Sequence, residues 1–243
     1  LRKNNQAQKS KELYAIQTEP NISSIPPEGI IIAKSGKYQL MNDITWTPTA
    51  SGSAIWLLGK DVVLNLNGFT LTVNAPTTNN GLQFNGIKLG ISDSDLTTSN
   101  ALTLQNGTIN GASYYGVNAI QTTNFEISNV TVGNMHYTET EKANLTACGI
   151  FIESSEAFNV QNCVVQNMTV TAPSCAGIQI VSSIDGNITG CTMHNFTNHD
   201  GSVQGFSYLE SSNITTNSCS NKKFQSHYKG LTKTIGHKVI GYV

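Results

Sequence analysis

His199 and Asp200 are adjacent in a segment with the composition of a loop, and both side chains can transfer protons. Inverting glycoside hydrolysis needs two carboxyl groups roughly 6.5–9.5 Å apart across the scissile bond. Asp200 has no second carboxyl group at a matching offset, although Glu139 and Glu141 lie in the long segment 137–146. We assign no catalytic residue from the sequence, and expect these four to act only if the protein cleaves polysaccharide.

Aromatic side chains near these loops suit a different chemistry, the stacking of sugar rings. If the protein binds carbohydrate, we expect four exposed tyrosines to make the contacts, namely Tyr114, Tyr115, Tyr137 and Tyr208.

Three cysteines, Cys163, Cys191 and Cys219, are spaced 28 residues apart. A zinc site normally converges four ligands tetrahedrally, which a linear stack does not offer. We therefore expect an interior ladder of small apolar side chains and no metal site. Cys148 and Cys175 start neighbouring repeats at offsets that differ by one residue, and their disulfide state stays open.

The overall composition excludes several classes of function. Only 12% of the residues are charged and the net charge is −1, so the chain has no basic field for nucleic acid. No apolar run approaches the roughly 20 residues of a membrane span, and no signal-peptide pattern is visible. We expect no cofactor.

An internal repeat organises the elements that must position these residues. Glycines at 116, 149, 177 and 205 are followed by apolar residues at the same offsets, paired two apart as in a strand. Asn134, Asn167 and Asn195 also share an offset, which predicts an asparagine ladder at a turn. Further upstream, Trp56 and Leu58 form an apolar pair. About three short strands per coil and about six or seven coils predict an all-β, single-stranded parallel β-helix.

The segments Gly36–Ile44 and Val62–Leu71 carry a family resemblance. They resemble motifs of the right-handed parallel β-helix, or pectate-lyase-like, superfamily, although Asn65 and Phe69 replace the usual Asp and His. The repeat is also similar to β-helix proteins of large DNA viruses and of bacterial surfaces. This resemblance implies the fold and its right-handed sense, but it is nearly silent on activity because the fold hosts many chemistries.

Pectate-lyase chemistry would need a basic residue, usually arginine or lysine, and an acidic cluster that holds calcium. Arg2 is the only arginine, so the arginine base of that family is missing. Asp93 and Asp95 form the densest acidic patch but lack further carboxylate ligands. We therefore favour a non-enzymatic structural or adhesive module, and leave the enzyme question open. The alternative is a protein that binds or cleaves polysaccharide.

Three regions follow from these patterns. Residues 1–29 would be a tail with a short capping helix within 3–17 and a linker, residues 30–226 the β-helix, and residues 227–243 a cap or partner-binding tail. We expect protein partners at the two tails, as a homo-oligomer such as a trimer or a larger assembly, and a glycan as a further ligand. The expected location is a virion, a cell surface or the extracellular space.

Overall fold

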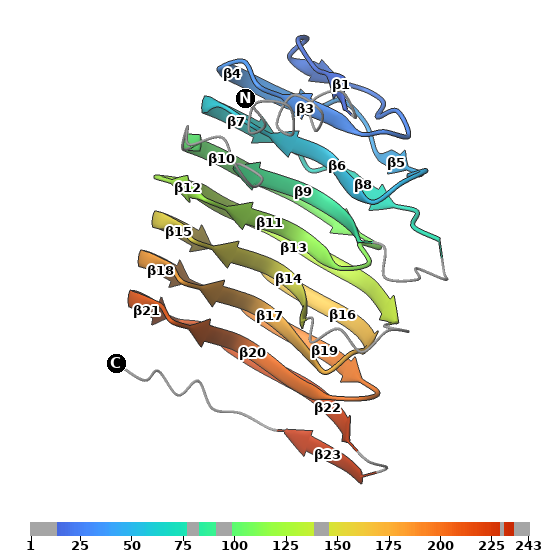
Figure 1. Cartoon of the computed structure of the whole chain (residues 1–243), viewed down its shortest axis with the longest axis vertical. Helices are drawn as coiled ribbons and strands as arrows, with labels where there is room; N and C mark the ends of the chain where they lie inside the picture. The colour runs from blue at the N-terminus through green and yellow to red at the C-terminus, as the bar shows by residue number, and fades with distance from the viewer. Residues whose placement is uncertain (1–13, 77–82, 91–98, 139–145, 229–230, 236–243) are drawn as a thin grey trace, which may run out of the picture.

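The computed structural model describes residues 14–76, 83–90, 99–138, 146–228 and 231–235. All regular elements in these ranges are β-strands, stacked one coil above the next from the N-terminal to the C-terminal end (Figure 1). The described residues contain no helix that is long and apolar enough to cross a membrane.

One sheet, which we call sheet A, has eight strands in the order β1-β3-β6-β9-β11-β14-β17-β20. Its strands are β1 (Ala15–Ile16), β3 (Ile30–Ile32), β6 (Gly52–Leu57), β9 (Phe84–Gly90), β11 (Tyr115–Ile120), β14 (Thr146–Glu153), β17 (Ser174–Val181) and β20 (Ser202–Leu209).

The other fifteen strands form sheet B, which bends into two faces. They are β2 (Asn21–Ile22), β4 (Gly36–Leu40), β5 (Ile44–Trp46), β7 (Lys60–Asn65), β8 (Thr70–Val73), β10 (Ser99–Asn110), β12 (Thr122–Thr123), β13 (Glu126–Thr138), β15 (Glu156–Gln161), β16 (Val164–Thr171), β18 (Ile184–Thr189), β19 (Thr192–Asn198), β21 (Ser212–Asn217), β22 (Ser220–Tyr228) and β23 (Leu231–Ile235).

The strand register confirms the predicted parallel β-helix. In sheet A, Ile150 pairs with Val117 on one side and with Ile178 on the other. On the first face of sheet B, Val160 stands in the same relation to its two neighbours, and on the second face Val165 does so. Each coil therefore contributes one segment to each of three faces, and the crossover rule for parallel strands favours the right-handed sense.

Stacked apolar columns fill the interior of the coils. The rings of Phe125 and Phe158 stack with centroids 5.3 Å apart, and those of Phe196 and Phe224 with centroids 4.7 Å apart. Gly186 follows Phe158 in its column, and a Cβ there would overlap the Phe158 ring. The apolar residues are therefore fixed in register by shape as well as by backbone pairing.

Asparagine amides link successive coils along one bend of sheet B. Asn195 donates to Asn167 at 3.0 Å, Asn167 to Asn134 at 3.2 Å, and Asn134 to Asn110 at 3.3 Å. Asn134, Asn167 and Asn195 have positive φ, a conformation that asparagine tolerates better than most residues. The three predicted residues thus lie in one ladder.

The capping helix was expected within 3–17, and the described part of that range is not helical. Ala15–Ile16 is a strand, because Ala15 N–H donates to Gly29 O and Gln17 N–H to Ile31 O. Residues 3–13 lie outside the described residues. Trp56 was expected to face the interior, but Ile55 pairs with the interior Ile87, so Trp56 faces outward. A slip of one residue reverses the face of every side chain in a strand.

The C-terminal end differs from the rest of the coil. β23 pairs with β22 in antiparallel fashion, whereas the other pairings among the described strands are parallel. The limits 30 and 226 proposed for the β-helix domain stay a prediction.

Candidate functional site

Of the four candidate acid and base residues expected from the sequence, the structure describes His199 and Asp200. His199 and Asp200 lie in the turn after β19, which the buried Asn198 organises by accepting hydrogen bonds from Asp200 N and Ala172 N. Glu139 and Glu141 lie outside the described residues. A carboxyl pair between these segments stays a prediction.

The expected exposed aromatic surface is wrong for three of the four tyrosines. Tyr114, Tyr115 and Tyr137 are buried, with 2%, 9% and 1% of their surface exposed. They pack on one another and on Phe151, which stacks on Tyr115 with ring centroids 4.5 Å apart. The rings bury each other, so they offer no open face for a sugar. Tyr208 alone is exposed, at 36%, and its hydroxyl contacts that of Thr216.

The cysteine ladder lies in register inside the coil. Cys163 and Cys191 are buried and Cys219 is partly exposed. A hydrogen bond from the Cys191 thiol lowers the pKa of Cys163, and the same contact raises the pKa of Cys191 to about 12. The described residues hold no cluster of three or more His, Cys, Asp or Glu side chains suited to a metal ion.

Cys148 and Cys175 are both free and buried. Cys148 pairs across the sheet with Ala176, and Cys175 pairs with Ala147, so the two cysteines are one residue out of register. Burial raises the pKa of Cys175 to about 12 and that of Cys148 well above its usual range. Both thiols are therefore neutral and unreactive at neutral pH.

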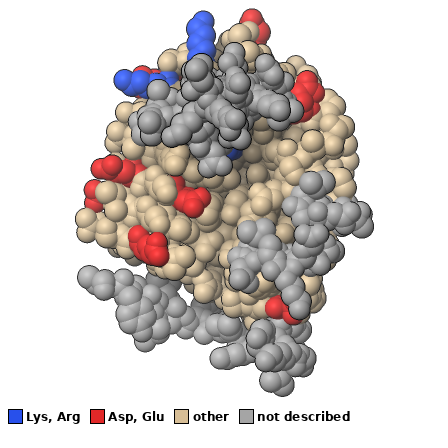
Figure 2. Space-filling view, viewed as in Figure 1, with Lys and Arg blue, Asp and Glu red and all other residues tan. Residues whose placement is uncertain are grey.

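A groove lies on the outer face of sheet A. It has a volume of about 440 Å³ and crosses strands β6, β9, β11 and β14. In Figure 2, uncharged residues make up most of the visible surface of the described residues. Several acidic side chains lie toward the left of this view. Its lining is mostly amides and hydroxyls, from Tyr14, Ser51, Ser53, Gln83, Asn85, Asn118, Gln121 and Ser154, with Lys88 and Glu153 as its charged members.

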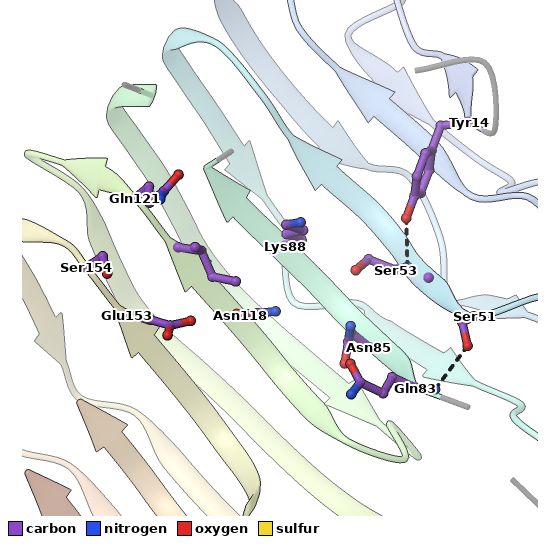
Figure 3. A pocket seen from close by; sticks show the side chains of 12 residues that line it. Tyr14, Ser51, Ser53, Gln83, Asn85, Lys88, Asn118, Gln121, Glu153 and Ser154 are labelled. Carbon is purple, nitrogen blue, oxygen red and sulfur yellow. Dashed lines mark hydrogen bonds between the residues drawn. The ribbon is translucent and has the colours of Figure 1, made fainter. Parts of the chain in front are cut away.

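The N-terminal segment forms one wall of this groove. The Tyr14 hydroxyl accepts a hydrogen bond from Ser53 N–H at 3.2 Å (Figure 3). Burial raises the pKa of Tyr14, although the bond from Ser53 opposes this shift. The phenol therefore remains protonated and can donate to a ligand.

In the floor of the groove, the ammonium group of Lys88 lies over the indole ring of Trp56. Lys88 pairs with Trp56 on the neighbouring strand, and its Nζ is 4.7 Å from the centre of the Trp56 ring. Trp56 Nε1 donates to Gly90 O at 2.6 Å. The ring and the strand backbone therefore hold the stem of Lys88 in the groove.

Asn118 is the unusual residue of the lining. It is 6% exposed, and its Oδ1 is buried without a hydrogen-bond partner in the structure. An unsatisfied buried acceptor costs about 1–3 kcal/mol. By contrast, the neighbouring Asn85 uses its Oδ1 to accept from Tyr115 N–H at 3.1 Å. Asn118 thus has a hydrogen-bonding capacity that the fold does not use.

Glu153 supplies the negative charge of the groove. It pairs with Ile120 of β11, two residues beyond Asn118, and Figure 3 shows Asn118 between Lys88 and Glu153. Burial, then Cys148 and Tyr114, raise the pKa of Tyr115, and the nearby Glu153 adds to this effect. Glu153 therefore lies near the phenol of Tyr115 and lines the groove together with the amides of Asn118 and Gln121.

These groove residues were missed from the sequence. The apolar pairs stand one and three residues after each repeat glycine, so the residue between them must face outward. Lys88, Asn118, Phe151 and Gln179 occupy that position in successive coils. This row was readable in the repeat, but the wall formed by Tyr14 was not, because it depends on a strand pairing of the N-terminal segment.

Fold and site together define a parallel β-helix protein with a polar groove on the outer face of sheet A. No family model and no curated protein sequence matches the chain.

Several solved β-helix structures are similar to it. The A-module of the mannuronan C-5 epimerase AlgE6 from Azotobacter vinelandii is 9% identical, with 86% of this chain and 90% of that one covered and a TM-score of 0.32. The Streptococcus pneumoniae surface protein and adhesin PfbA is 11% identical, over 86% and 63%, with a TM-score of 0.32. The enzymatically active domain of tailspike protein 2 from bacteriophage CBA120 is 13% identical, over 88% and 38%, with a TM-score of 0.31.

Proposed function

We propose that the chain is an adhesive β-helix module that binds a saccharide in the groove of sheet A. The observation that carries this proposal is the amide of Asn118, which is held in the groove with its oxygen unpartnered. Sugars present many hydroxyl groups, each of which both donates and accepts, and a row of amides and hydroxyls matches that pattern.

The rigid scaffold supports binding without large motion. Asn85, Lys88 and Asn118 lie on strands that pair on both sides, and strands hold side chains more precisely than loops. A groove that is already formed loses little conformational entropy when a ligand enters. We expect a polysaccharide to lie across the strands of sheet A.

Cleavage is the second candidate function. Glu153 provides one carboxyl group, and two-carboxylate hydrolysis requires a second one. Cleavage would therefore depend on Glu139, Glu141 or Asp200. Mass spectrometry of fragments released from acidic and neutral polysaccharides, with and without calcium, tests it. Fragments that disappear with Asp200→Asn would replace the adhesive proposal by an enzymatic one.

Binding is tested by calorimetry with oligosaccharides found on a glycan array. Asn118→Leu keeps the size of the side chain and removes its polar atoms, and should weaken binding by tenfold or more. Asn159→Leu, an exposed asparagine on sheet B, is the matched control and should bind as the wild type does. Equal losses for both variants, or no glycan bound by the wild type, would refute the proposal.

We also propose that residues 1–29 and 227–243 hold protein partners on a virion, a cell surface or a secreted assembly, as a homo-oligomer or a larger complex. Deleting either tail should reduce self-association or particle incorporation while the β-sheet content is retained. Unchanged association after both deletions would contradict this assignment.

A further inference from the structure

We infer that the groove selects a saccharide that carries an N-acetyl group, with the acetamido N–H bonded to Asn118 Oδ1 and the acetyl methyl group against Ile120. This inference rests on the proposed saccharide binding and names the chemical class of the ligand. Its basis is one unpartnered acceptor that lies beside one partly exposed apolar side chain on the same strand.

Asn118 presents an acceptor that needs a donor from the ligand. Its side chain is 6% exposed, and its Oδ1 has no hydrogen-bond partner among the described residues. The fold satisfies the other asparagine of this face, since Asn85 Oδ1 accepts from Tyr115 N–H. A ligand N–H or O–H that reaches Asn118 Oδ1 therefore recovers the cost of an unsatisfied buried acceptor.

Ile120 adds an apolar surface beside that acceptor. It lies two residues beyond Asn118 on β11, so strand alternation directs both side chains to the outer face. Ile120 lines the groove, is partly exposed, and lies outside the apolar interior cluster of the described residues. It pairs with Gly90 on the neighbouring strand, where a Cβ would overlap Ile120 O, so no side chain from that position covers it.

An acetamido group matches both features at once. Its nitrogen and methyl carbon are about 2.4 Å apart by standard bond lengths, and the Cα atoms of Asn118 and Ile120 are about 6.8 Å apart by the strand rise. The N–H can thus bond to Asn118 while the methyl group contacts Ile120. A sugar hydroxyl also donates to Asn118, but it brings no methyl group and leaves Ile120 against water.

Gln121 provides a donor for the acetamido carbonyl. It directly follows β11, and its positive φ breaks the strand alternation, so its side chain lines the groove next to that of Ile120. The carboxamide of Gln121 carries two N–H groups that can donate to a carbonyl oxygen. The acetamido group carries no charge, so its binding does not depend on the charges of Lys88 or Glu153.

Two neutral probes that differ only at one substituent test this inference. N-acetylchitotetraose and cellotetraose share a β-1,4-linked backbone of glucose configuration, and C2 carries an acetamido group in the first and a hydroxyl group in the second. Calorimetry on the full chain should give an affinity about tenfold higher for N-acetylchitotetraose. This is the effect expected of one neutral hydrogen bond and one buried methyl group.

A pair of variants of equal shape locates the methyl contact. Ile120→Val keeps a methyl group where Ile120→Thr places a hydroxyl, so any effect on folding is closely matched. Ile120→Val should keep most of the tenfold preference, whereas Ile120→Thr should reduce it to about threefold, with cellotetraose within about twofold of wild type in both. Asn118→Leu removes the acceptor and should likewise reduce the preference to about threefold. Ile184→Thr, at an isoleucine of sheet B that is 41% exposed, is the matched control and should keep the full preference.

The outcomes separate this inference from the proposed function. Equal affinities of the wild type for the two probes would overturn the N-acetyl inference while saccharide binding stands. A preference that is as large in Ile120→Thr as in Ile120→Val would also overturn it, as would a glycan-array ligand that lacks an N-acetyl group. If neither probe bound and the glycan array also gave no ligand, both proposals would fail.

Discussion

Lys88 lies over the outward-facing ring of Trp56, with Nζ 4.7 Å from the ring centre. A large aromatic residue at an outward strand position is costly when water surrounds it, and here the lysine and Tyr14 cover it. Tyr14 meets the same ring edge-on with centroids 5.4 Å apart. Trp56 is therefore only 4% exposed although it lies outside the coil. The contacts of Trp56 with Lys88 and Tyr14 in the floor of the groove thus help to stabilise the N-terminal coils.

Replacing Trp56 by phenylalanine should lower the free energy of unfolding by about 1–2 kcal/mol, because the bond from Nε1 to Gly90 O is lost and a smaller ring remains. Urea denaturation measures this change. Lys88→Met isolates the cation and should cost about 0.5–1 kcal/mol. If Lys88→Met proved as costly as Trp56→Phe, the indole hydrogen bond would not be the main contribution.

Removing the unpartnered amide should stabilise the fold while it impairs binding. Asn118→Leu eliminates a buried acceptor, and we expect the free energy of unfolding to rise by about 1 kcal/mol. Thermal and urea denaturation measure it. Asn85→Leu is the informative contrast, because the bond from Tyr115 N–H is lost there and stability should fall. A destabilised Asn118→Leu variant would mean that the amide has a structural role.

The sequence predicts much of this fold because the repeat specifies it several times over. Ile150, Ile178 and Phe206 occupy the same offset in successive coils, so the register can be read without coordinates. Trp56 was misplaced because its coil lacks the repeat glycine and offers five apolar residues in a row, Ala54 to Leu58. Ile55 and Leu57 fill the interior there, which leaves the indole outside.

The site was harder to predict than the fold, for two physical reasons. The outward row that contains Lys88 and Asn118 follows from strand alternation, but the repeat does not indicate which members of it line a groove. Tyr114, Tyr115 and Tyr137 were expected at the surface as single residues, whereas their mutual packing buries them. Burial of an aromatic cluster depends on neighbouring coils and cannot be read from one strand.

Gly186 should be intolerant of side chains, because the ring of Phe158 occupies the space beside it. Gly186→Ala should lower the free energy of unfolding by about 1–3 kcal/mol through overpacking. Phe158→Leu in the same chain should recover part of that loss, since the smaller side chain makes room. A double-mutant cycle by urea denaturation measures the coupling, and purely additive effects would show that the two sites do not compete for space.

The asparagine ladder should depend most on its inner members. Asn167 donates to Asn134 and accepts from Asn195, whereas the described bonds of Asn195 are limited to the one to Asn167. Asn167→Ala should therefore cost about 1–2 kcal/mol, and Asn195→Ala about half as much. Asn167→Gly keeps the positive φ accessible and should fall between wild type and Asn167→Ala. Equal costs at both positions would argue that backbone conformation, and not the amide bonds, determines stability.

Stability should decline in alkaline solution because of the buried thiols. Burial raises the pKa of Cys175 to about 12, whereas an unfolded cysteine titrates near about 8.5. Between these values the folded state retains a proton that the unfolded state releases, so the contribution is complete below about pH 8.5 and is lost as the pH rises toward 12. The loss is about 1.4 kcal/mol per pH unit for one such thiol. Cys175→Ala removes this proton, and the free energy of unfolding of the variant, measured in urea, should fall less steeply with pH than that of the wild type. Lysine and tyrosine titrations affect both chains alike, so the difference in slope belongs to Cys175, and parallel pH curves would show that its thiol ionises as readily in the folded chain as in the unfolded one.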